Sequence, residues 1–167
     1  ILRKGGIHEG RGGFKVEHPE FLLYPTLFHQ QRESVIPSAQ ARFDELAPHF
    51  PPKGTLRFRH WAKVVEWHDL QSRELLDALR GQHIWTDDLL RERFEWGKAA
   101  HIYALAVRVF ELPAVVEIPE EPEYGGCKSW ITMRQEIETD GSEPVLAESA
   151  FESRLEQFRG SLLQSAS

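Results

Sequence analysis

The chain has 167 residues, of which 41% are hydrophobic and 28% charged, a composition that predicts one folded domain and excludes wholesale disorder. No apolar run approaches the roughly 20 residues of a membrane-spanning helix, and the single cysteine, Cys127, cannot close an internal disulfide, so we expect a cytoplasmic protein without a membrane partner. The net charge of −6 gives no overall reason to expect nucleic acid, but residues 1–32 carry five basic side chains against three acidic ones.

The first 25 residues predict short strands separated by glycine turns. Residues 1–3 have the composition of a strand interior, so we expect that further residues precede Ile1 in the full protein. The Gly-Gly pairs at 5–6 and 12–13 supply the positive φ angles that tight turns need. An apolar strand follows at 20–24, and Pro25 ends it because proline cannot donate to a strand ladder.

One helix and one long strand are predicted between residues 37 and 67. Pro37 begins the helix, since proline is tolerated in the first turn, and the prolines at 48, 51 and 52 end it. From Thr55 to Trp67 the sequence predicts a strand. Leucine and phenylalanine first alternate with arginines, and valines and tryptophans continue the apolar pattern.

Two short helices follow the long strand. Asp69 or Ser72 caps the first, which ends near Gly81. Thr86 caps the second, where Asp87 and Asp88 complement the positive end of the helix dipole.

The last third of the chain predicts strands and a terminal helix. His101 to Phe110 has the apolar content of a central strand, and 113–122 is an extended acidic segment at an edge. A glycine turn at 125–126 leads into another strand, and an amphipathic helix begins at about Pro144. The apolar face of this helix consists of Phe151, Leu155, Phe158 and Leu162.

These elements predict a single α+β domain spanning 1–167. The sheet is expected to be mixed or mostly antiparallel and partly closed, because no connection repeats a regular βαβ unit. Several short helices and the C-terminal amphipathic helix would pack against it.

Polar side chains able to hold an anion are concentrated in the first 32 residues. Pairing of the strands at 1–3 and 20–24 would bring their polar ends to one sheet edge, where guanidinium, ammonium and imidazole groups suit a phosphate or carboxylate. The alternative is that these side chains lie separately in solvent. The candidate ligand-binding residues are Arg3, Lys4, His8, Tyr24, Thr26, His29, Gln30 and Arg32.

Two further stretches combine basic and aromatic residues. Lys128 follows a glycine turn and can reach an anion, and an exposed Trp130 could stack on a base; alternatively, a hairpin buries Trp130 together with Cys127. The stretch 57–63 alternates basic and aromatic residues, which is typical of nucleic-acid surfaces but also of a half-exposed strand with a solvated basic face.

Other site chemistries find little support in the sequence. His8, His18 and His29 are ten and eleven residues apart, which matches no standard zinc spacing, and the glycine pairs form neither a Walker loop nor a dinucleotide fingerprint. Cys127 would need a nearby base to act as a nucleophile. We therefore predict no metal and no cofactor.

Three motifs carry a family resemblance: residues 2–7, residues 21–30 and residues 123–130. In these motifs the chain resembles the bacterial family called domain of unknown function 1802, over most of its length. Members occur in cyanobacteria and other bacteria, and some are joined to restriction-endonuclease-type catalytic domains. The resemblance implies a role near restriction–modification or DNA handling and assigns no catalytic residues.

Three hypotheses of function follow. The first is a binding module for a polyanion such as nucleic acid, through the N-terminal basic and histidine residues together with Lys128 and Trp130. The second is a hydrolase or nuclease in which His8 or His29 is the general base. The third is an interaction domain that forms oligomers through the C-terminal helix, which requires the apolar face of that helix to be exposed.

Overall fold

The fold is organised around two long antiparallel strands, β5 (Thr55–Leu70) and β6 (Ile102–Pro119). A computed structural model describes residues 1–4, 8–10, 13–15, 18–25, 31–97, 99–124 and 130–164. The two strands pair along their whole length, from Thr55 opposite Pro119 to Leu70 opposite Ile102. Since strand partners lie side by side, this pairing brings together residues that are 32 positions apart in the sequence at one end and 64 at the other.

Shorter strands complete the main sheet in the order β1–β6–β5–β4. The added strands are β1 (Leu2–Arg3), β4 (Glu20–Leu23) and, at a separate place on β6, β7 (Glu143–Pro144). All pairings are antiparallel. A second, two-stranded sheet consists of β2 (His8–Gly10) and β3 (Gly13–Lys15).

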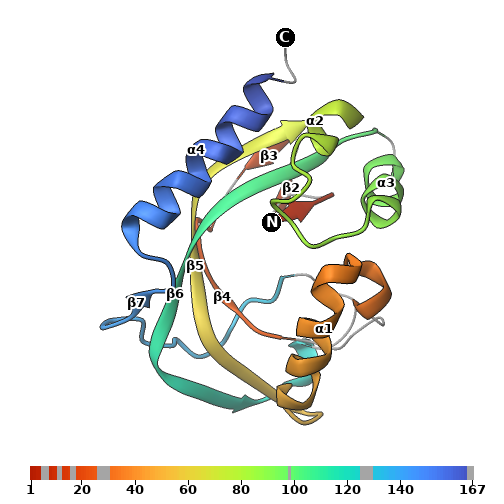
Figure 1. The fold of residues 1–167 in the computed structure, drawn as a ribbon. Coiled ribbons are helices and arrows are strands. Elements are labelled where there is room, and N and C mark those ends of the chain that lie inside the picture. Colours follow the sequence, from red (N-terminus) through yellow and green to blue (C-terminus); the bar gives the residue numbers. More distant parts are fainter. Residues whose placement is uncertain are drawn as a thin grey trace.

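The main sheet is bent into half of a barrel (Figure 1). Two irregularities interrupt the β5–β6 register, one between Phe58 and His60 and one between Val64 and Glu66. Extra residues on one strand of a pair bend that strand and increase its twist, so these irregularities favour the curvature. The C-terminal helix α4 (Glu148–Gln164) lies along the outside of the bend, and α1 (Pro37–Leu46) lies on the side toward which the sheet curves (Figure 1).

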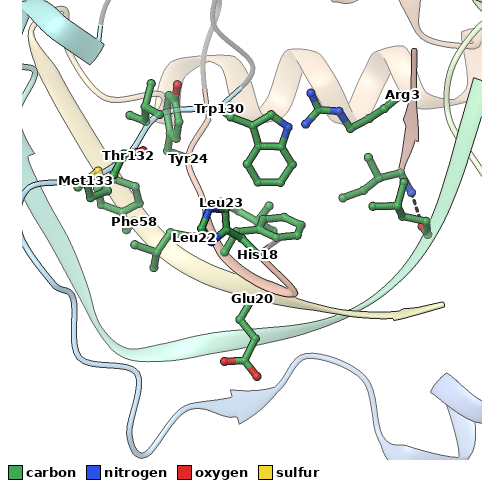
Figure 2. A pocket seen from close by; sticks show the side chains of 14 residues that line it. Arg3, His18, Glu20, Leu22, Leu23, Tyr24, Phe58, Trp130, Thr132 and Met133 are labelled. Carbon is green, nitrogen blue, oxygen red and sulfur yellow. Dashed lines mark hydrogen bonds between the residues drawn. The ribbon is translucent and has the colours of Figure 1, made fainter. Parts of the chain in front are cut away.

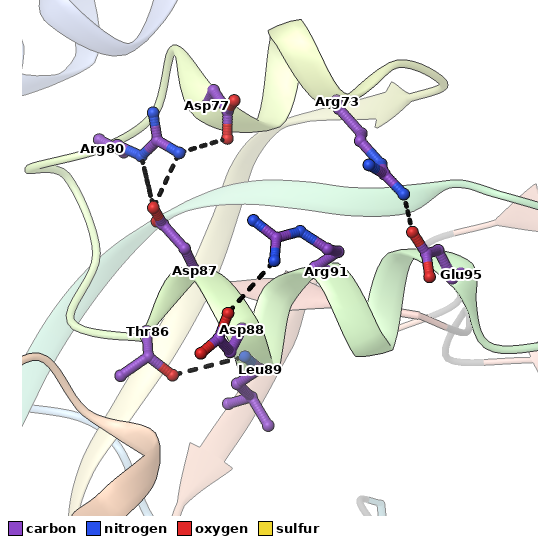
Figure 3. A network of polar contacts seen from close by, with 9 residues as sticks. All are labelled: Arg73, Asp77, Arg80, Thr86, Asp87, Asp88, Leu89, Arg91 and Glu95. Carbon is purple, nitrogen blue, oxygen red and sulfur yellow. Dashed lines mark hydrogen bonds and ion pairs between the residues drawn. The ribbon is translucent and has the colours of Figure 1, made fainter.

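Two helices near the end of β5 begin at side-chain caps. The Ser72 hydroxyl accepts from the Leu75 N–H at the start of α2 (Arg73–Asp77), and the Thr86 hydroxyl accepts from the Leu89 N–H at the start of α3 (Asp87–Glu95). Ion pairs join the two helices: Arg80 pairs with Asp77 and Asp87, and Arg73 pairs with Glu95 (Figure 3). Three short 3₁₀ helices occupy Gln31–Ser34, Ala47–His49 and Pro122–Tyr124.

The larger core cluster joins α2, α3 and α4 to the ends of β5 and β6. Its buried side chains include Leu70, Ile102 and Phe158. A second cluster around Phe58 and Leu112 lies at the other end of the two strands, under residues 131–137. Within the described residues, every helix is too short or too polar to cross a bilayer.

The structure confirms the α+β class and the largely antiparallel, partly closed sheet. The predicted strand 55–67 continues to Leu70, so Ser72 rather than Asp69 is the cap of α2. The segment 113–122, predicted as a separate edge, mostly continues β6, because its residues still pair with β5.

Two boundaries near the end of the chain were predicted wrongly. Trp130 and Ile131 lie in no strand, and Ile131 packs instead against the second core cluster. The C-terminal helix begins at Glu148, since Pro144 pairs with Phe110 as part of β7.

Neighbouring leucines on α4 provide a test of this packing. Leu162 is buried in the larger core cluster, and Leu163 is 71% exposed. We expect Leu162→Ala to lower the free energy of unfolding by about 2–5 kcal/mol and Leu163→Ala by less than about 1 kcal/mol, because both changes alter helix propensity equally and only one leaves a cavity. Urea denaturation of the two variants checks this, and equal losses would contradict the docking of α4.

Candidate functional site

A cavity of about 390 Å³ lies where β1, β4 and the segment 130–133 approach one another (Figure 2). Its floor is formed by buried side chains of the two long strands, Phe58 from β5 and Leu105 from β6. The remaining lining residues are Ile1, Arg3, His18, Glu20, Phe21, Leu22, Leu23, Tyr24, Trp130, Ile131, Thr132 and Met133. The cavity is thus mainly apolar and aromatic, with a few polar groups at its mouth, as small-ligand sites usually are.

An arginine stacked on a tryptophan is the most distinctive feature of this cavity. The guanidinium carbon of Arg3 lies 4.6 Å from the centre of the Trp130 ring, a cation–π geometry. Phe21 meets the same indole edge-on, with ring centres 4.7 Å apart. Figure 2 shows the indole nitrogen on the side toward Arg3. That nitrogen is buried, and no acceptor for it exists among the described residues.

The charge of Arg3 is held in an unfavourable environment. Burial and then the neighbouring Arg93 guanidinium lower the pKa of Arg3 to about 10. No residue in the described part of the chain forms an ion pair or hydrogen bond with this guanidinium. At neutral pH Arg3 is still protonated, so the cavity presents a cation whose desolvation an acidic partner does not offset.

The other polar groups around the cavity differ in availability. The Glu20 carboxylate points away from the cavity in Figure 2 and forms an ion pair of 3.0 Å with Lys63. Burial, and to a smaller extent Glu120, raise the pKa of Tyr24, so its phenol stays protonated and can donate. His18 is exposed at the rim.

The structure brings three of the sequence-predicted ligand residues together and places two elsewhere. Arg3, Tyr24 and Trp130 line the same cavity. The Lys4 ammonium donates to the carbonyls of residues 94, 99 and 101, at 2.6–2.9 Å, and so holds the end of α3 in place. Arg32 makes two hydrogen bonds to the Asp44 carboxylate of α1. Neither of these cations lines the cavity.

Five other predicted residues cannot be compared with this geometry. Thr26, His29, Gln30 and Lys128 lie outside the described residues, as does the side chain of His8, which belongs to β2. The hypothesis of a histidine general base at position 8 or 29 therefore stays a prediction. The suggested nucleophile Cys127 also lies outside the described residues.

The basic and aromatic stretch 57–63 is less available than its composition indicates. Arg57 pairs with Glu117 of β6 and donates to the His49 carbonyl, and Lys63 pairs with Glu20. Trp61 stacks on Phe110 with ring centres 4.4 Å apart. These pairings between neighbouring strands turn the stretch into structural contacts.

The sequence analysis did not identify several lining residues as site residues, because their local sequence looks like that of ordinary core residues. Phe21 and Phe58 have the spacing of ordinary strand residues, and Met133 lies in an irregular segment. Their role at the cavity follows from the curvature of the sheet, which no short motif encodes.

The apolar face of α4 bears on the hypothesis of oligomers. Leu155, Phe158 and Leu162 are buried in this chain's own core, and Phe151 packs against it. This is the outcome that counts against the helix as a surface for a second copy.

Comparison with known proteins assigns a family. The family described as Domain of unknown function (DUF1802) matches residues 1–157. Searches of curated proteins and of solved structures give no match.

Neutralising Arg3 should not destabilise the protein. At any pH below about 10 the guanidinium is charged in the folded and unfolded states, so its desolvation lowers stability. We expect Arg3→Met, which keeps an apolar stem over Trp130, to leave the free energy of unfolding unchanged or to raise it by about 1 kcal/mol, allowing for solvent screening.

The matched control is Arg57→Met, which removes an arginine with a carboxylate and a carbonyl partner. We expect this control to lower the free energy of unfolding by about 1 kcal/mol. Urea denaturation at pH 7 measures both, and a loss for Arg3→Met as large as that of the control would show that Arg3 is an ordinary structural residue.

Proposed function

We propose that this protein, which belongs to the DUF1802 family, is a cytoplasmic module that binds single-stranded nucleic acid at the cavity beside Arg3 and Trp130. The observation that carries the proposal is the half-buried Arg3 guanidinium stacked on the Trp130 indole. A phosphate supplies the anion that this guanidinium lacks, and a base supplies a flat ring for the aromatic groups.

The chemistry of the cavity matches both halves of a nucleotide. A phosphate oxygen near Arg3 would offset the desolvation that lowers the pKa of this residue. Aromatic side chains bind the faces of unstacked bases with about 1–3 kcal/mol per base. Trp130, Phe21 and Tyr24 all line this cavity and are the aromatic groups that a base could contact.

The site favours a single strand over a duplex. Stacking requires a base whose face is accessible, and the bases of a duplex are covered by their neighbours. The net charge of −6 and the ion pairs of the 57–63 stretch also leave no broad basic surface for a double helix among the described residues. A cavity of about 390 Å³ accommodates one nucleotide at a time.

The family resemblance supports a setting for this activity. The resemblance implies a place near DNA handling, since some members of the family are joined to restriction-endonuclease-type catalytic domains. We therefore propose that the module contributes binding, with the catalytic step carried by other domains or proteins.

Titration with a single-stranded oligothymidylate tests the proposal. We expect binding that weakens steeply with salt, and a smaller salt slope for Arg3→Met, by about 0.7 for one lost phosphate contact. Trp130→Leu should weaken binding by about 5- to 100-fold, in line with the loss of one stacked base. Fluorescence anisotropy of a labelled strand at several salt concentrations measures both effects.

Two control variants make the test specific. Arg42→Met removes an exposed arginine of α1, and Trp96→Leu removes a tryptophan that is 72% exposed; neither residue lines the cavity. Both should bind as the parent protein does. The proposal fails if no salt-sensitive binding to single-stranded DNA or RNA is found, or if Arg3→Met binds as well as Arg42→Met.

A further inference from the structure

A second cavity, of about 400 Å³, lies where α4 begins beside β6. It is lined by apolar side chains and by three nitrogen-bearing ones, Arg108, Arg154 and His60. No carboxylate belongs to its lining among the described residues. Arg108 and the stacked Arg3 project from opposite faces of the sheet. Arg3 of β1 lies opposite Tyr103 of β6, so these two side chains share a face. Arg108 is five positions after Tyr103 on β6, and side chains an odd number of positions apart on a strand point to opposite faces.

Arg108 is the best-buried charged residue described in this protein. Its side chain is only 9% exposed, and its guanidinium lies over the Phe151 ring of α4, 4.4 Å from the ring centre. One terminal nitrogen, Nη2, donates to the Glu148 carboxylate at 3.0 Å. The other, Nη1, is buried, and no acceptor for it exists among the described residues.

The ion pair with Glu148 leaves this guanidinium incompletely satisfied. The Glu148 side chain is 77% exposed and bonds through one oxygen to one nitrogen. An arginine presents paired N–H groups that fit both oxygens of a carboxylate, and a buried donor without an acceptor is costly. The Nη1 donor of this buried cation therefore has no acceptor among the described residues.

The surroundings of Arg108 suit an acid with an apolar body. An adjoining cavity of about 480 Å³ shares five lining residues with the cavity of about 400 Å³ at Arg108: Val107, Val109, Leu146, Phe151 and Arg154. Most of the shared walls are apolar, whereas Arg154 is exposed and forms no ion pair with a described residue. An inorganic anion would leave those walls uncovered, and an alcohol would leave the guanidinium unpaired.

We propose that the two adjoining cavities beside α4 form a binding site for a small carboxylic acid with an apolar chain or ring. The ligand carboxylate takes the place of Glu148 on Arg108 and bonds both Nη1 and Nη2, with Arg154 as a second cation. The apolar body lies against Phe151 and the two valines of β6. Arg108 and Arg3 lie on opposite faces of the sheet, although Leu23 borders both the nucleic-acid cavity and the cavity at Arg108. The two proposals use different cations and different ligands, so each has its own test.

Octanoate is a suitable probe, with 1-octanol and inorganic phosphate as comparisons. We expect titration calorimetry of the parent protein to show saturable binding of octanoate, and binding of octanol and phosphate that is at least about tenfold weaker, since each lacks one half of the recognised structure. Equal binding of octanoate and octanol would overturn the assignment of the carboxylate to Arg108.

The variant that separates this site from a structural ion pair is Glu148→Gln. If Glu148 competes with the ligand for Arg108, removing its charge should tighten octanoate binding by about three- to tenfold. Arg108→Met should abolish binding, and Arg154→Met, at an exposed position that preserves folding, should weaken it by about threefold. A purely structural role for the Arg108–Glu148 pair predicts that Glu148→Gln leaves octanoate binding unchanged or weaker, which would refute the proposal.

Arg159→Met is the matched control. Arg159 is another arginine of α4, pairs with Glu66 and lines neither cavity. The Arg159→Met variant should bind octanoate as the parent protein does. A loss of octanoate affinity as large as that of Arg154→Met would mean that only the overall positive charge on the helix matters, which would contradict the assigned role of Arg154.

Discussion

The antiparallel pairing of β5 with β6 positions nearly every other feature of this protein. β1 adds to the outer edge of β6 and β4 to the outer edge of β5, so their side chains would lie far apart on a flat sheet. The two bulges bend the long strands, and the bend brings Arg3 of β1 and Phe21 of β4 to one cavity. The inner face of the bend holds this cavity, and the outer face receives α4.

Two arginines, the half-buried Arg3 and the buried Arg108, lie over aromatic rings on the two faces of the sheet. Arg3 lies over Trp130 and Arg108 lies over Phe151, and aromatic rings stabilise both cations. Several other arginines pair with carboxylates, as Arg57 does with Glu117 and Arg80 with Asp87. Desolvating a guanidinium without complete acidic pairing is costly to stability. Arg3 has no acidic partner among the described residues, and the Nη1 of Arg108 has no acceptor, so each proposal assigns an external anion to one of these two arginines.

Local rules succeeded at two helix caps, where the deciding contact is close in sequence. Ser72 and Thr86 accept from N–H groups three residues later, as the sequence predicts. Local rules failed where a distant partner decides. Residues 113–119 continue β6 because β5 lies beside them. Lys4 was expected to bind an anion, but its ammonium donates to the backbone carbonyls of Phe94, Ala99 and His101.

The sequence by itself determined the α+β class, the starts of α1 and α3, the central strand and the N-terminal arginine as a site candidate. Each of these depends on composition, periodicity or a contact within one turn of chain. Only the tertiary structure decided that Arg3 faces Trp130 and that Arg108 is buried under α4, because both contacts join residues at least forty positions apart. Such contacts depend on the register and curvature of β5 and β6. Many weak side-chain pairings along the two strands together set this register, so no single sequence motif encodes it.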